Sequence, residues 1–221
     1  MKIIASIKKS ENVRFISHLD VQRMLQRTVR RADIPVAFSQ GFNPHPLISF
    51  ATALATGQTG DCEWIEIKFE KEMEINDFVN RMNKSFPDGF EITNAFIAKE
   101  GMPAVANLMV SATYCVYTSD VVEYDVLESS INSLMSSEII VKKHKKQNGK
   151  KITDAEVDIR PLVYEFTINS CDETGIKLHI KGRLDVAGGL NADLLLKSLN
   201  EKLGRDILWH IHRKSIELKE Y

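Results

Sequence analysis

The sequence contains little cysteine and no long apolar run. Its three cysteines, Cys62, Cys115 and Cys171, are far apart and lie in strand-like patterns, which excludes the disulfide framework of a small secreted domain. No apolar stretch approaches the roughly 18 residues that span a membrane, and the apolar stretch near the N-terminus is too short for a secretion signal. These absences predict a cytoplasmic protein with reduced thiols and no membrane partner.

The chain also lacks the usual catalytic and metal-binding motifs. It contains no CxxC, HExxH, GxSxG or P-loop pattern. His210 and His212 are two residues apart on an expected strand, but no third or fourth ligand lies near them in the sequence, which disfavours a zinc site. We therefore predict no catalytic residue, no metal and no cofactor, and we favour a protein that is not an enzyme.

Charge of one sign is not in excess, because 29 Lys and Arg stand against 30 Asp and Glu. This balance by itself predicts no nucleic-acid partner, but the distribution is uneven. Residues 1–60 carry eight basic and three acidic residues, residues 61–141 carry five and fifteen, and residues 142–151 contain six lysines. The two basic segments either form a local electrostatic footprint for a polyanion or are ordinary solvated faces.

The hydrophobic pattern predicts an α+β fold. At 221 residues the chain is long enough for one domain or for two of about 100 residues each. Alternating apolar residues indicate strands at 2–7, 47–51, 61–70 and 90–98. Helical spacing indicates one helix that begins after Ser17 and ends before Pro35, and another over residues 75–85.

The same order of elements repeats after residues 101–103. Strands are expected at 108–117, 162–169, 175–184 and 207–218, with helices at 120–135 and 191–203. An extra hairpin over 139–145 and 151–159 encloses Asn148-Gly149, a strong turn signal. We therefore predict two consecutive ferredoxin-like (split βαβ) units with antiparallel sheets, at residues 1–102 and 103–221, the second with an extra basic hairpin.

The densest group of special residues is the loop Ser39-Gln40-Gly41-Phe42-Asn43-Pro44-His45-Pro46. Asn43 and His45 each precede a proline and are pushed toward extended backbone, so the loop is stiff. A stiff loop that presents an imidazole, an amide and an aromatic ring suits contact with a ligand. The alternative is a rigid connector in which Phe42 fills the core and His45 bonds a backbone carbonyl.

A second candidate is the start of the first helix, Ser17-His18-Leu19-Asp20. His18 lies in the first turn, where free N–H groups and the helix dipole favour anions, and the loop at 39–46 could fold back to meet it. Alternatively, Ser17 and Asp20 only cap the helix and His18 makes a local hydrogen bond.

Two basic elements could contact nucleic acid. The first helix carries Arg23, Arg27 and Arg30 opposite its apolar side, and guanidinium groups match phosphate oxygens. Arginine is equally ordinary on an exposed helix surface. The basic hairpin either reaches along RNA or keeps an exposed strand edge from pairing; its lysines are Lys142, Lys143, Lys145, Lys146 and Lys150.

Together these residues resemble the signature of a known family. The segments RF-x-SHLD-x-x-R and RRA-x-x-PVA-x-SQGFNPHP-x-ISF are similar to the radical-SAM-linked protein family, a domain of unknown function found fused to, or encoded beside, B12-binding-type radical S-adenosylmethionine enzymes. Weaker similarity continues to Asp158-Ile159-Arg160-Pro161 and His212-Arg213, and so spans nearly the whole chain. The candidate substrate-binding residues are Arg14, Ser17, His18, Asp20, Ser39, Gly41, Phe42, Asn43 and His45.

The resemblance implies an accessory protein. Radical SAM enzymes hold their cluster on a Cys-x-x-x-Cys-x-x-Cys motif, which this chain lacks, so it resembles the partner that binds or orients the substrate. Genes of the family tend to lie near genes for RNA processing and ribosomal proteins. The leading hypothesis is therefore a non-catalytic, substrate-binding module that acts with a separate radical SAM enzyme in RNA or ribosome-related modification.

Two alternatives remain. Doubled ferredoxin-like units with a histidine in the first helix also resemble CRISPR repeat-processing endonucleases, in which case His18 or His45 would act as the general acid–base on RNA. The glycine-rich loop of those enzymes is echoed only faintly, at Gly188-Gly189-Leu190. The other alternative is a scaffold that docks the radical enzyme through Trp64 and the loop at 39–46.

Overall fold

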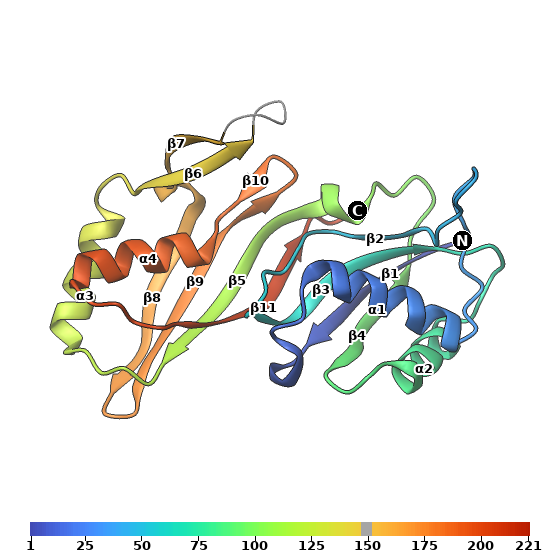
Figure 1. The fold of residues 1–221 in the computed structure, drawn as a ribbon, viewed down its shortest axis with the longest axis horizontal. Helices are drawn as coiled ribbons and strands as arrows, with labels where there is room; N and C mark the ends of the chain where they lie inside the picture. The colour runs from blue at the N-terminus through green and yellow to red at the C-terminus, as the bar shows by residue number, and fades with distance from the viewer. Residues whose placement is uncertain (147–151) are drawn as a thin grey trace. The chain divides into compact units, whose positions relative to one another are not determined.

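The computed structural model describes residues 1–146 and 152–221 (Figure 1). It confirms a mixed α+β fold, with four α-helices in the described residues and mostly antiparallel strands. The chain divides into two compact units, residues 1–110 with 212–221 (unit 1) and residues 111–211 (unit 2). This division differs from the predicted one at 102/103, since the end of the chain belongs with the first unit rather than the second.

Unit 1 contains an antiparallel sheet in the order β4-β1-β3-β2. Its strands are β1 (Lys2–Lys9), β2 (Ile48–Phe50), β3 (Thr59–Lys68) and β4 (Phe90–Ile97). The last strand of the chain, β11 (His210–Leu218), pairs in parallel with the start of β3, where His212 faces Thr59 and Arg213 faces Gly60. The sequence pattern predicted the strand itself but not this pairing.

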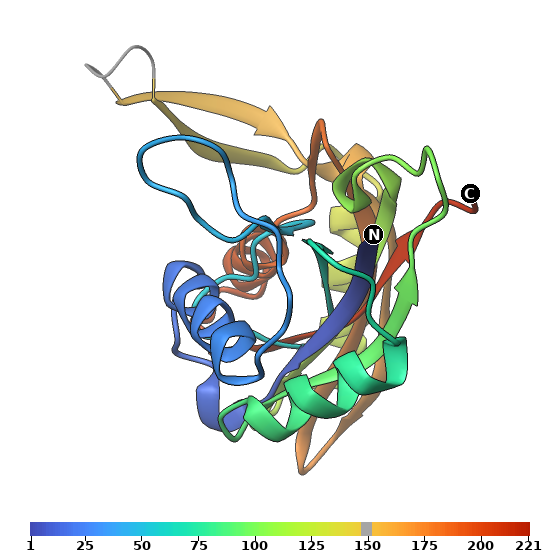
Figure 2. The ribbon, with the colours of Figure 1, turned by 90° about the vertical axis from the view of Figure 1, so that its right-hand side faces the viewer.

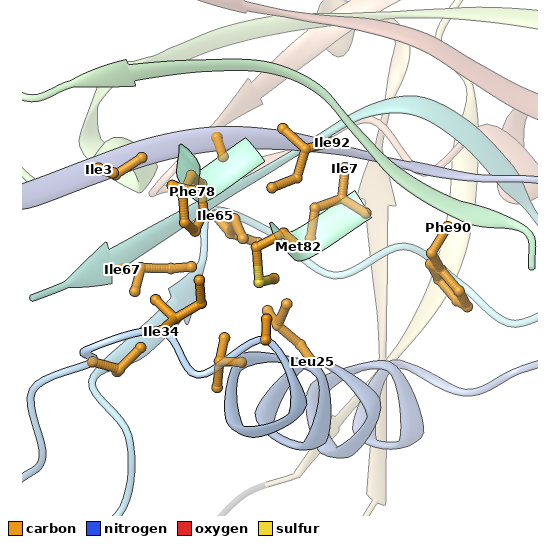
Figure 3. Close-up of a cluster of buried hydrophobic side chains, with 14 of the residues drawn as sticks. Ile3, Ile7, Leu25, Ile34, Ile65, Ile67, Phe78, Met82, Phe90 and Ile92 are labelled. Atoms are coloured by element: carbon orange, nitrogen blue, oxygen red, sulfur yellow. The ribbon is translucent and has the colours of Figure 1, made fainter. Parts of the chain in front are cut away.

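Two helices, α1 (His18–Arg31) and α2 (Ile75–Ser85), pack on one face of this sheet (Figures 1 and 2). The register places Ile3 opposite Ile67 and Ala5 opposite Ile65, so alternate apolar side chains of neighbouring strands point to the same face. Figure 3 shows them meeting the helices in the core of unit 1, which includes Ile3, Ile7, Leu25, Ile65, Ile67, Phe78, Met82 and Ile92.

The boundaries of α1 follow from its sequence. Ser17 is the N-cap, and its hydroxyl accepts from the backbone N–H of Asp20 at 3.3 Å. The helix ends at Arg31, and Asp33 then takes a left-handed backbone conformation (φ 48°) just before Ile34-Pro35. A short 3-10 turn, η1 (Glu11–Val13), links β1 to the cap.

Unit 2 is built around β9 (Gly175–Asp185), which pairs antiparallel with β5 (Met109–Thr118) and β8 (Val163–Asp172). Its helices are α3 (Tyr124–Met135) and α4 (Ala192–Leu203). The strands β6 (Ile140–Lys146) and β7 (Ile152–Asp158) form a separate antiparallel pair, as the predicted hairpin requires. Unit 2 also contains the short elements η3 (Arg160–Leu162) and β10 (Gly188–Gly189), whereas the remaining one, η2 (Val105–Leu108), belongs to unit 1.

The helices of the described chain are short. The longest, α1, has 14 residues, and among the described helices none combines the length and the apolar character needed to cross a membrane.

Candidate functional site

The arginines of α1 face solvent, as the sequence predicts. Val21, Leu25, Thr28 and Val29 form the buried side of the helix. Arg23, Arg27, Arg30 and Arg31 are exposed. The helix therefore packs through its apolar side and presents a basic side, which is the arrangement that its periodicity indicates.

A groove of about 570 Å³ runs beside these arginines in unit 1. Its lining combines side chains of α1 with the segment that follows α2: Asp20, Arg23, Met24, Arg27, Arg31, Ser85, Phe86 and Pro87. Three arginines against one aspartate leave the groove with a net positive charge. Arg30 is exposed but does not belong to this lining.

The three groove arginines are held to different degrees. Arg31 is fixed, because its Nη2 donates to Thr28 Oγ1 at 3.0 Å and to the Ser85 carbonyl at 2.9 Å. Arg23 pairs with Asp20 at 3.0 Å, but both side chains are more than half exposed, so the pair contributes little net energy. Arg27 has no hydrogen-bond or ion-pair partner within residues 1–146 and 152–221.

Phe86 adds an aromatic ring to the basic groove. It is half-buried and stacks on Phe90, with ring centres 6.4 Å apart and an interplanar angle of 28°. The pattern of α1 alone shows no aromatic residue among its arginines, and Phe86 lies more than 50 residues later in the chain. Only the packing of α1 beside the end of α2 brings the ring and the arginines together.

Asp20 is the acidic member of this groove. A hydrogen bond from Ser17 and the neighbouring Arg23 hold the pKa of the Asp20 carboxyl below its usual value. Asp20 and Ser17 therefore have a demonstrated capping role, and their predicted role in substrate binding stays a prediction.

His18 lies at the edge of a different and much smaller space. Its ring meets Phe50 edge-on at 5.0 Å, and its Nε2 lies 3.1 Å from Gln22 Nε2. Lys9 and Glu63 also line this cavity of about 20 Å³, which has room for about one water molecule. Burial lowers the pKa of His18; the Glu63 charge opposes this shift, and the charges of Arg213 and Lys9 add to it.

Buried charged side chains line or adjoin this small cavity. Arg213 Nε donates to Glu63 Oε1 at 2.8 Å, and the two side chains are 4% and 8% exposed. Lys9 is 4% exposed and donates to the carbonyl oxygens of Arg14 (2.8 Å) and Ile16 (3.0 Å). Burial lowers the pKa of Lys9, an effect that the Glu63 carboxylate opposes. Of these three, only Arg213 belongs to a sequence signature; Lys9 and Glu63 carry no signal along the chain.

The loop at 39–46 closes on itself. The Ser39 hydroxyl lies 2.8 Å from His45 Nδ1 and accepts from the His45 backbone N–H at 3.1 Å. Gly41 has a positive φ of 122° that favours glycine, and residues 40–45 are exposed. The interpretation that Phe42 fills the core is wrong, because its side chain is fully exposed to solvent.

The predicted site residues do not share one pocket. His18 lines the small cavity, to which the described loop residues contribute no side chain, and His45 is bonded to Ser39 instead. Arg14 pairs with Glu11 and lies over the Phe15 ring. If His18 or His45 acted as a general acid–base, the other histidine would therefore not lie in the same cavity to assist it.

The docking role of Trp64 is wrong. Trp64 is only 8% exposed, and its indole N–H donates to the Ile216 carbonyl at 3.4 Å. The side chain is covered by its neighbours, which include Phe96, whose ring centre is 6.0 Å away, and Ile216 of β11.

The basic hairpin is described only in part. Lys142, Lys143, Lys145 and Lys146 belong to the backbone of β6, and Lys150 lies outside the described residues. For metals, the described residues contain no group of three or more His, Cys, Asp or Glu arranged to hold an ion.

The comparisons with known proteins identify a family. Residues 2–193 match the family described as "Uncharacterized protein conserved in bacteria (DUF2344)", and the chain belongs to it. No curated protein matches the sequence.

Solved structures show a similar fold at very low identity. A chain of the Cbf5-Nop10-Gar1 complex matches 97% of this chain at 9% identity with a TM-score of 0.53. A chain of the archaeal box H/ACA sRNP Nop10-Cbf5 complex matches 99% at 10% identity with a TM-score of 0.50. The chain spans about half the length of these proteins, 48% and 49%. At such identities the likeness concerns the fold alone.

Proposed function

We propose that this member of the DUF2344 family is a non-catalytic RNA-binding module that holds phosphates in the groove beside α1. The observation that carries the proposal is the convergence of Arg23, Arg27 and Arg31 with Phe86 on one groove. Guanidinium groups bond phosphate oxygens in pairs, and an aromatic ring among them suits a nucleic acid better than a simple anion.

The contacts that each groove arginine already makes within the protein favour the binding of phosphate. Arg31 is already fixed by two hydrogen bonds, so little side-chain freedom remains to be lost when it meets a phosphate. Arg27 has no partner within the described chain, and the exposed Arg23–Asp20 pair can be exchanged for a phosphate contact at small cost. Internal ion pairing therefore does not account for this basic face.

The fold gives modest further support. The order β4-β1-β3-β2 with antiparallel neighbours is the one expected of a ferredoxin-like unit, and we extend this assignment to unit 2, where β9 lies between β5 and β8. One of the similar solved structures is named as part of an sRNP, a ribonucleoprotein. An RNA or ribosomal partner is consistent with that name.

Other sequence candidates have secondary roles in this proposal. His18, Asn43 and His45, with Arg14, Ser17, Asp20, Ser39, Gly41 and Phe42, would contact the specific feature of the substrate. Arg30 and the lysines of the hairpin, Lys142, Lys143, Lys145, Lys146 and Lys150, would add phosphate contacts. The exposure of residues 40–45 supports the role of the loop.

We further propose that the module acts with a separate radical SAM enzyme in the cytoplasm. This part rests on the resemblance of the SHLD and GFNPHP segments to the radical-SAM-linked family. Co-purification of the two proteins, with and without RNase, tests it: the partnership predicts association that survives RNase, and no association under either condition contradicts it.

The RNA proposal is tested by fluorescence anisotropy with an unstructured RNA. We expect the whole protein to bind with a dissociation constant in the range of about 10⁻⁴ to 10⁻⁶ M at physiological salt, and more tightly at low salt. Changing Arg23, Arg27 and Arg31 together to Gln should weaken binding at least tenfold. A protein that shows no affinity, or the same affinity at about 50 and 200 mM salt, would overturn the proposal.

A matched variant controls for the loss of three charges. Lys68, Lys71 and Lys219 are exposed residues of unit 1 that do not line the groove. Changing these three lysines to Gln removes the same charge and should weaken binding much less. Equal weakening by both variants would mean that net charge, rather than the groove, attracts RNA.

A further inference from the structure

Two exposed apolar side chains precede the arginines of α1. Phe15 is 70% exposed and Leu19 is 62% exposed. Leu19, Arg23 and Arg27 follow one another at steps of four residues, about 6 Å along a helix, so they form one ridge. Phe15 comes four residues before Leu19 in the sequence, in the turn that precedes the Ser17 N-cap, so it lies outside the helix and is not part of this ridge.

The backbone around Phe15 is anchored on both sides. The Lys9 ammonium donates to the carbonyl oxygens of Arg14 and Ile16, the residues that flank Phe15. The backbone N–H of Gly57 donates to the same Arg14 oxygen at 2.9 Å. A buried ammonium costs folding free energy unless it is hydrogen-bonded. The bonds that satisfy the Lys9 ammonium also fix the backbone of the turn from which the exposed Phe15 side chain extends.

The exposed ring has a cation beside it. The Arg14 guanidinium carbon lies 4.6 Å from the centre of the Phe15 ring, within the range of a cation–π contact. Arg14 is itself held by an ion pair with Glu11. The ring nevertheless keeps most of its surface accessible, so it can receive a second flat group.

The geometry points to Phe15 as a stacking platform for an unpaired nucleobase, so the RNA bound by this protein is single-stranded. This inference rests on the proposed function, because the phosphates of the same strand would lie along the arginines. Bases stack on aromatic side chains with little dependence on sequence. In a duplex the bases are already stacked on one another, and the arginines alone would make contact.

A protein partner fits the same surface less well. Three arginines that follow Phe15 and Leu19 in the sequence line a basic groove, and an exposed aromatic ring together with a basic groove is the combination that binds single strands. An acidic peptide would satisfy the charges but would make no use of the exposed aromatic ring of Phe15.

The test compares two RNA probes on the whole protein. Binding of an oligouridine and of an RNA duplex of equal length is measured by anisotropy for the wild type and for Phe15→Ala. We expect the substitution to weaken oligouridine binding by about 5- to 150-fold and to leave duplex binding and both salt dependences unchanged. Phe15→Tyr, which keeps a stacking ring, should retain near wild-type affinity.

A control and the possible outcomes separate this inference from the proposed function. Tyr124, an exposed aromatic residue of α3 in unit 2, is changed to Ala and should have no effect. If no RNA binds the wild type, the proposed function itself fails. If RNA binds in a salt-dependent way but Phe15→Ala weakens both probes equally or neither, the stacking platform is wrong while the groove stands. If Phe15→Ala abolished co-purification with the radical SAM enzyme but left RNA affinity unchanged, the platform would also be wrong and the surface would be assigned to a protein partner.

Discussion

Glu63 and Arg213 form an ion pair whose two side chains are almost wholly buried, 150 residues apart in the chain. Burial of a pair is weak evidence of stability, but removal of one partner leaves a charge unpaired in the core. We predict that Glu63→Gln lowers the free energy of unfolding by about 3–5 kcal/mol, measured by urea denaturation.

Two further variants test that reasoning. The Lys8–Glu91 pair is exposed, at 40% and 53%, so Glu91→Gln should cost less than about 1 kcal/mol. Combining Glu63→Leu with Arg213→Met removes both buried charges and should be less damaging than Glu63→Gln. Similar losses in Glu63→Gln and Glu91→Gln would contradict the account of the buried pair.

His18 should make stability depend on pH. Its pKa in the folded protein is lowered by burial from its ordinary value of 6.5, so the unfolded chain takes up a proton at a higher pH than the folded protein does. The contribution of His18 to the free energy of unfolding is therefore fully present above about pH 6.5. It is lost as the pH falls from that value toward the pKa of His18 in the folded protein. We predict that the urea midpoint falls less between pH 7.5 and 5.5 in His18→Gln than in the wild type. Identical pH profiles would contradict this role.

At the scale of elements, the side chain that closes the loop at 39–46 is Ser39, which adds to the backbone bond from its own N–H to the His45 carbonyl. Ser39 bonds the ring and the backbone N–H of His45, and none of residues 40–45 is buried. We predict that Ser39→Ala changes the free energy of unfolding by less than about 1 kcal/mol but speeds amide exchange at His45 markedly, as measured by NMR. The exposed Ser49 of β2 is a matched control for the loss of one hydroxyl. Unchanged exchange at His45 would show that the Ser39 hydroxyl does not hold the loop, which would leave the backbone bond from Ser39 N–H to the His45 carbonyl (2.9 Å) and the prolines to do so.

The elements also show what local sequence can predict. The cap at Ser17, the buried stripe of α1 and the helix end before Pro35 follow from propensity and spacing, and the structure has all three. The turn at Arg14 to Ile16 follows only in part from local sequence. The N–H groups of Arg14 and Ile16 bond to the nearby carbonyls of Glu11 and Val13, but their own carbonyl oxygens accept from Lys9, and that of Arg14 also from Gly57. Helical periodicity likewise places the arginines but cannot place Phe86 beside them.

At the scale of the whole molecule, the α+β class and most of the element order could be predicted because each strand and helix has a clear hydrophobic period. The division of the chain could not, because the pairing of β11 with β3 links residues about 150 positions apart. The buried group of Lys9, Glu63 and Arg213 was missed for the same reason. Its members are scattered in sequence, and charged residues are usually expected on the surface.

The central claim, that the α1 groove holds RNA by its phosphates, is tested most directly by the salt dependence of binding. The slope of the logarithm of the affinity of oligouridine against the logarithm of salt concentration reports the number of phosphates contacted, at about 0.7 per contact for a single strand. If Arg23, Arg27 and Arg31 each contact one phosphate, the triple Gln variant should have a slope shallower than that of the wild type by about 2. The variant with Lys68, Lys71 and Lys219 changed to Gln should keep the wild-type slope. Equal slopes in the wild type and the arginine variant would contradict the account.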